Sequence, residues 1–115
     1  MPYSTDGKNL MLDALAPAYA SLHSGDPGDN GANEISGGTP AYIRKATTWN
    51  SASGGAIDSS NQPVFDVPAS TTVSYVGFWT AESGGTFLGA ADVTDEIFAN
   101  QGTYTLTDAD LDLNA

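Results

Sequence analysis

Nearly every apolar stretch of this chain is a short run with two-residue alternation, and Gly, Pro, Asp and Asn separate the runs. The run at 73–80 is the strongest, and we place it centrally because both of its alternating faces carry large apolar groups. Other short strands are predicted at 19–23, 42–49, 64–67, 87–93, 103–107 and 111–113. Short strands at this spacing are typical of a sandwich or barrel. We expect a mainly β fold, an antiparallel β-sandwich of the immunoglobulin-like or jelly-roll-like kind.

One segment departs from this pattern. Residues 4–16 carry apolar side chains at helical spacing, begin with residues that can cap a helix, and stop at Pro17, which predicts one short N-terminal helix at about 5–16. Its apolar residues are Leu10, Met11, Ala14 and Leu15. Residues from about 24 to 40 are rich in Gly, Pro, Asp and Asn and predict a long surface loop. The length of 115 residues suits a single domain, 1–115.

The net charge of −11 and the small share of aliphatic residues approach the composition of disordered chains. Four Phe, five Tyr and two Trp are spread along the sequence, and each buries more area than an aliphatic residue, so we expect a folded core. The strand phases assign to this core Leu22, Ile43, Phe65, Val76, Phe78, Phe87, Tyr104 and Leu106.

Charge and cysteine content exclude several functions. Three basic residues, Lys8, Arg44 and Lys45, stand against 14 acidic ones, so the chain cannot neutralise a run of phosphates and we expect no nucleic-acid partner. There is no basic amphipathic face and no long apolar run, so no membrane partner is expected. The absence of cysteine removes disulfides, thiol catalysis and zinc–thiolate sites. The first residues lack the features of a signal peptide, which predicts assembly in a cytoplasm.

His23 is the one histidine, and Ser21, Ser24 and Asp26 lie near it in sequence. A nucleophile, a base and a carboxylate are thus present, but the spacing along a strand is unsuitable and no Gly-x-Ser-x-Gly turn occurs. We therefore expect a surface or turn-bonding histidine, no catalytic residue, and no enzyme.

Two groups of oxygen-bearing side chains are candidate calcium ligands. Asp108, Asp110 and Asp112 alternate like the first half of a calcium loop, but no Gly or terminal Glu completes it, and a solvated strand face explains the spacing equally. The second group lies in the long loop and could instead hold turns: Asp26, Asp29, Asn30, Asn33 and Glu34. We expect no metal and no cofactor.

The pattern Trp-x-x-x-Ser-Gly-Gly-x-apolar occurs twice, at 49–57 and at 79–87. In each copy a strand would end at Trp, turn at Gly-Gly and return. Such turns need positive φ, which glycine adopts freely, so both copies predict hairpins. A gene duplication is the other interpretation.

Three stretches, 20–28, 31–38 and 76–81, read ASLHSGDPG, GANEISGG and VGFWTA. With them the chain resembles a family of small tailed-phage virion proteins, the minor tail or tail-fibre-type proteins of actinobacterial phages. The resemblance implies a non-enzymatic virion structural protein whose partners are other virion proteins and copies of itself, with a host-surface glycan as a further candidate. Two alternatives stay open: a capsid decoration protein, and a carbohydrate-binding module that stacks sugars on exposed Trp49 or Trp79.

The predicted helix is the candidate assembly interface. A two-layer sandwich does not need the stripe of Leu10, Met11, Ala14 and Leu15 to close its own core. The stripe could pack across an open end of the sandwich or dock on a neighbouring subunit. We favour the neighbour, because the adjacent 24–40 loop also has little to bury and would gain order from a partner.

Overall fold

The computed structural model describes residues 3–107 and the backbone of 110–112. It is mainly β, with 41% of residues in strands, antiparallel pairing and one short helix, as the alternation predicts. The elements in chain order are α1 (Thr5–Leu15), β1 (Tyr19–His23), β2 (Lys45–Ala46), β3 (Ala56–Asp58), β4 (Val64–Val67), β5 (Thr71–Trp79), β6 (Phe87–Phe98), β7 (Gly102–Thr105) and β8 (Asp110–Asp112).

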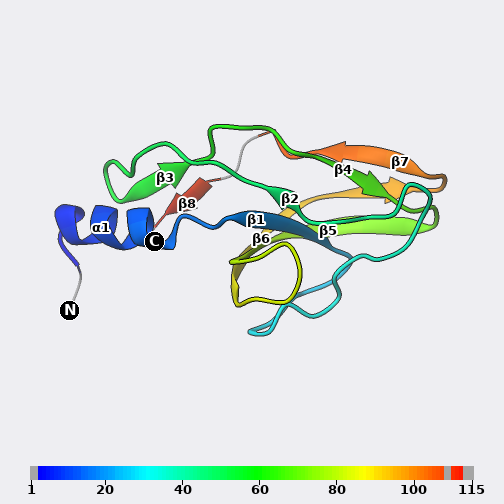
Figure 1. Ribbon diagram of the computed structural model, residues 1–115, viewed down its shortest axis with the longest axis horizontal. Coiled ribbons are helices and arrows are strands. Elements are labelled where there is room, and N and C mark those ends of the chain that lie inside the picture. Colours follow the sequence, from blue (N-terminus) through cyan, green and yellow to red (C-terminus); the bar gives the residue numbers. More distant parts are fainter. Residues whose placement is uncertain (1–2, 108–109, 113–115) are drawn as a thin grey trace.

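The strands form a four-stranded sheet in the order β2-β1-β5-β6 and two antiparallel pairs, β3-β8 and β4-β7. Figure 1 shows β4 and β7 over one side of the four-stranded sheet, while β3 and β8 lie toward the end where α1 packs. The second layer of the sandwich is thus divided between two ladders. This strand order supports the prediction of a sandwich, in the general sense of two facing layers of antiparallel strands.

The main core lies between the four-stranded sheet and β4. Leu22 of β1 and Phe78 of β5 are almost fully buried there against Phe65 and Val67 of β4. These side chains belong to one alternating face of each strand, as strand geometry requires. The structure confirms the predicted burial of Leu22, Phe65, Val76, Phe78 and Leu106.

The opposite face of the sheet is also covered. Ser21 and His23 alternate with the core residues of β1 and have no exposed surface, and Trp79 of β5 is only 8% exposed. The loop at 24–34 lies over this face, on the side away from β4 and β7 (Figure 1). The sequence predicts a half-buried strand at 19–23; the structure instead buries both faces, because the loop closes the polar one.

α1 is anchored through one face. The Ser4 hydroxyl caps it by accepting from the Gly7 N–H at 3.0 Å, and the helix ends at Leu15, one residue before the predicted end. Leu12 is buried on the side that contacts β3, and Asn9 and Asp13 on either side of it accept backbone N–H groups of the 49–57 hairpin.

Both Gly-Gly turns have the predicted conformation. Gly54 and Gly55 have φ of 62° and 78°, and the residues flanking them, Ser53 and Ala56, exchange two backbone hydrogen bonds. Gly84 and Gly85 have φ of 66° and 74° in the longer turn between β5 and β6. Only glycine enters this region without strain, so the hairpin interpretation is confirmed.

The predicted strand at 42–49 is wrong in its length and in which of its side chains point into the core. Only Lys45–Ala46 joins the sheet, and Ile43, expected in the core, is 48% exposed while its neighbour Tyr42 is buried. The chain buries the larger ring here because Tyr42 also finds hydrogen-bond partners inside. Phe87 and Tyr104, also expected in the core, are only half-buried.

Candidate functional site

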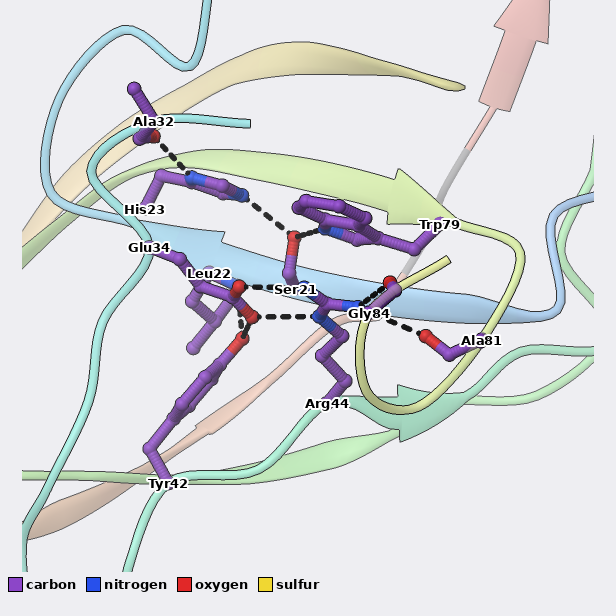
Figure 2. Close-up of polar contacts among 10 residues, drawn as sticks. All are labelled: Ser21, Leu22, His23, Ala32, Glu34, Tyr42, Arg44, Trp79, Ala81 and Gly84. Carbon is purple, nitrogen blue, oxygen red and sulfur yellow. Dashed lines mark hydrogen bonds and ion pairs between the residues drawn. The ribbon is translucent and has the colours of Figure 1, made fainter. Parts of the chain in front are cut away.

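The most developed polar cluster of the described chain is centred on Arg44. Its guanidinium donates to both Glu34 carboxylate oxygens at 3.0 Å, and it donates to the carbonyls of Ala81 at 3.0 Å and Gly84 at 2.9 Å (Figure 2). The Arg44 guanidinium carbon also lies 3.6 Å from the ring centroid of Trp79. One side chain thereby ties the end of the 24–34 loop to the 80–86 turn, using the bidentate geometry and stacking that arginine offers.

Tyr42 completes this cluster. Its hydroxyl donates to Glu34 Oε2 at 2.8 Å and accepts from the Leu22 N–H at 3.0 Å. Burial raises the pKa of Tyr42, so the phenol stays protonated. Burial alone would also raise the pKa of Glu34, but the hydrogen bonds from Arg44 and Tyr42 outweigh it and hold that pKa below its usual value. Glu34 is therefore a charged structural acceptor.

A second chain of hydrogen bonds is buried between the four-stranded sheet and the 24–34 loop. His23 Nδ1 is 2.8 Å from the Ala32 carbonyl oxygen, and His23 Nε2 is 2.7 Å from Ser21 Oγ (Figure 2). A carbonyl only accepts, so Nδ1 carries the proton and Ser21 donates to Nε2. Ser21 Oγ in turn accepts from the indole N–H of Trp79 at 2.9 Å. Burial is the largest effect on His23 and lowers its pKa, which favours this neutral form.

Ser21 and His23 share the hydrogen bond that a catalytic serine makes with its base, but a substrate has no access to them. Both side chains are fully buried, the serine oxygen is already engaged by Trp79, and the other histidine nitrogen faces a backbone carbonyl rather than a carboxylate. A substrate cannot reach this serine, so the pair holds the loop in place.

The expectation of a surface histidine is wrong, while the part that places His23 in a bond to the loop backbone is confirmed. Sequence reasoning missed the burial of Ser21 and His23. The available signal is Gly77, which lies opposite Ser21 in the middle of the strongest strand and leaves room for both side chains.

Two open grooves flank the segment that follows Glu34. One has a volume of about 320 Å³ and runs between this segment and the 80–86 turn, past Arg44. The other, of about 450 Å³, lies on the side of residues 70–72. Glu34 lines both grooves, so the hydrogen bonds from Arg44 and Tyr42 to its carboxylate hold one wall of each groove in place.

The predicted assembly residues do not share one face of α1: Leu10 and Ala14 lie opposite the anchoring Leu12, whereas Leu15, three residues after Leu12, lies beside it at the end of the helix. Leu10 is 72% exposed and Leu15 39% exposed, Ala14 is exposed, and Met11 is half-buried. The apolar residue that anchors the helix is Leu12, which the sequence analysis did not select.

Residues 8–114 match a protein family described as podophage GP4 fiber I protein gp80. The chain belongs to this family. No curated protein matches it. The membership makes the protein a tail-fibre-type component of a tailed phage, in agreement with the resemblance in the sequence.

The described residues contain no group of three His, Asp or Glu side chains that could hold a metal ion. No helix among them is long and apolar enough to cross a bilayer.

The calcium candidates of this fibre-family chain have different outcomes. Asp108 lies outside the described residues, and so do the side chains of Asp110 and Asp112, whose backbone pairs with β3. In the loop set, Asp26 accepts from the Gly28 N–H and the Asn33 amide donates to the Asp26 carbonyl. These two residues therefore hold turns, as the alternative interpretation predicted, and Glu34 is occupied by Arg44.

The carbohydrate-binding alternative requires an open tryptophan ring, and Trp79 does not offer one. Arg44 stacks on Trp79, which is buried, so a platform at Trp79 is wrong. Trp49 is half-buried, with its indole N–H on the Pro17 carbonyl at 2.7 Å and its ring edge-to-face with Phe78.

Proposed function

We propose that this protein is a non-enzymatic minor tail or tail-fibre component that attaches to other virion proteins through the outer face of α1. The observation that carries the proposal is that Leu12 anchors the helix while Leu10, on the opposite side, is 72% exposed and Leu15, at the end of the helix, is 39% exposed. The helix lies at one end of a body that measures 46 × 26 × 25 Å, where a neighbour can reach it (Figure 1).

Apolar area drives such a contact. Complete burial of a leucine side chain stabilises an association by about 1.5–3 kcal/mol, and Leu10 has most of its surface available. We infer that the partner is another virion protein or a second copy of this chain. We also propose that residues 1–115 act as one domain and that assembly takes place in the cytoplasm of an actinobacterial host.

The test is incorporation into particles. Leu10→Asp and Leu15→Asp should melt like the parent in isolation and enter particles at least tenfold less efficiently, because they place a charge in the contact. Leu10→Met should restore incorporation. Leu12→Ala is the matched control: it should lose about 2–5 kcal/mol of stability in the isolated chain because it opens the anchored face. Normal incorporation of both Asp variants would refute the helix contact.

Location separates the tail proposal from the capsid alternative. The protein should be found in purified tails. Its presence in purified heads alone would favour a capsid decoration protein instead.

Attachment to the host surface is the second part of the proposal. It is supported by the groove between residues 34–36 and the 80–86 turn, which has exposed Ile43 and Glu82 at its rim and a wall fixed by Arg44. A glycan array tests this part. A signal that Glu82→Ala and Ile43→Ala abolish would support it, and an array without signal would refute a glycan ligand.

A further inference from the structure

β6 is the open boundary of the four-stranded sheet. It is twelve residues long and, in the described part of the chain, pairs with β5 alone. In an antiparallel ladder alternate backbone N–H and C=O groups point away from the neighbouring strand, so the outer side of β6 presents a row of them. The opposite boundary, β2, is different: the Asn61 amide donates to the Ala46 carbonyl and accepts from the Thr48 N–H, which closes that edge.

The side chains of β6 carry negative charge, and the ion pair found among the described residues does not involve them. Asp92, Asp95 and Glu96 are exposed, and no basic residue follows Lys45 in the sequence. The ion pair found among the described residues joins Arg44 to Glu34, on the loop side of the sheet. A strand that added to β6 would therefore meet carboxylates that are free to pair.

A second copy of this chain is a poor occupant of the edge. Antiparallel self-pairing centred on the acidic stretch would set carboxylate opposite carboxylate, which destabilises a ladder. A register centred on Ala90 avoids this, but it opposes Gly89 to Ala91 at its centre, and Phe87 and Val93, which it would pair, are already half-buried against the chain's own residues. The ladder between β5 and β6 is also irregular between Val73 and Tyr75, which pair with Glu96 and Asp92. Such an irregularity bends a strand, so the carboxylates lie along a bent edge.

We propose that β6 receives an extended segment of another virion protein, rich in lysine or arginine on both of its faces, by strand addition to its outer edge. Backbone hydrogen bonds would provide the attachment, and the three carboxylates would select a basic segment and exclude self-pairing. Ile97, 78% exposed, offers an apolar contact on the same strand. The inference rests on the proposed assembly role for the source of the segment, but it concerns a different surface from α1.

The test uses the whole chain in solution and three ten-residue peptides. The first repeats Lys-Lys-Thr-Thr, so that lysines point to both faces, the second repeats Glu-Glu-Thr-Thr, and the third is the lysine peptide N-methylated at every internal residue. The lysine peptide at ten times its Kd should slow exchange of the outward amides of β6 by about tenfold and leave β1 unchanged. The N-methylated peptide keeps the charge but cannot donate, so it should give no protection.

A neutral variant tests the charge. Asp92→Asn, Asp95→Asn and Glu96→Gln together should weaken the lysine peptide by about tenfold, as expected for three exposed ion pairs. The matched control removes the same number of charges from exposed sites elsewhere, with Asp6→Asn, Asp29→Asn and Asp58→Asn. This control should change the affinity by less than about twofold, since its charges lie off the edge.

Three results would overturn the inference. Equal binding of the N-methylated peptide would exclude strand addition, and equal binding of the glutamate peptide would exclude charge selection. A dimer of the chain alone that protects β6 amides would make a second copy the occupant. None of these measurements needs a particle, so failure of the Leu10→Asp incorporation test and failure at β6 are distinguishable.

Discussion

Replacing Gly77 by alanine introduces one methyl group at the point where β5 passes beneath the buried Ser21–His23 pair. Gly77 is the register partner of Ser21. A Cβ atom built on Gly77 would lie 2.6 Å from both His23 Nε2 and Ser21 Oγ. Real Cβ atoms do not approach other heavy atoms so closely, so the two side chains must move apart or the strands must separate.

The magnitude follows from what that movement breaks. Ser21 Oγ and His23 Nε2 are 2.7 Å apart, and both side chains are fully buried, so water cannot replace the lost partner. Overpacking a core by a methyl group costs about 1–3 kcal/mol. Depriving a buried polar group of its hydrogen bond costs about 1–3 kcal/mol more. We expect Gly77→Ala to lose about 2–6 kcal/mol, a large part of the stability of a domain this size.

Urea unfolding followed by tryptophan fluorescence measures this loss, because Trp79 belongs to the same hydrogen-bond chain. Gly89→Ala is the control: Gly89 lies on the adjacent strand opposite Phe78, and a Cβ there meets no atom within 4 Å. The control should unfold within about 0.5 kcal/mol of the parent. If Gly77→Ala unfolds like Gly89→Ala, the buried polar layer does not have the geometry described here.

Three further predictions concern the core, the loops and pH. Phe78→Ala should lose about 3–5 kcal/mol in urea unfolding, since the ring is 2% exposed in the main core. Arg44→Lys should lose about 2 kcal/mol and speed amide exchange in the 80–86 turn, because lysine cannot make the same set of bonds. Burial lowers the pKa of His23, so the unfolded chain takes up its proton first as pH falls below about 6.5. The free energy of unfolding should be constant above that pH and decrease from 6.5 toward 4.5, before Glu34 begins to lose its charge; a flat profile there would contradict the neutral, buried histidine.

The local elements of the fold could be predicted because they depend on neighbouring residues. The helix needs a cap at Ser4 and a stop at Pro17, and the hairpins need glycine at positive φ; both requirements are visible in the sequence. The run at 73–80 carries large apolar groups on both faces, which correctly indicated a central strand. These signals act over a few residues and require no knowledge of what packs against them.

The polar layer could not be predicted in the same way. Alternation in β1 shows that its two faces differ, but it does not show that the 24–34 loop folds back over the polar one. Glu34 and Arg44 are ten positions apart, and the carbonyls that Arg44 binds lie some forty positions further on. The exposure of Ile43 has the same cause. Its neighbours Tyr42 and Arg44 point inward because residues distant in sequence supply their hydrogen-bond partners, and Ile43 between them points outward.

The use of Arg44 inside the molecule limits how this protein can meet its partners. Of three basic residues, one is committed to Glu34, and the surface that remains is strongly acidic. Two such surfaces repel each other, so a partner contact requires either apolar area or positive charge supplied by the partner. The outer face of α1 offers the first and the edge of β6 invites the second. The two surfaces belong to different parts of the fold, so one copy can engage two neighbours at once, as a component of a larger fibre assembly needs to do.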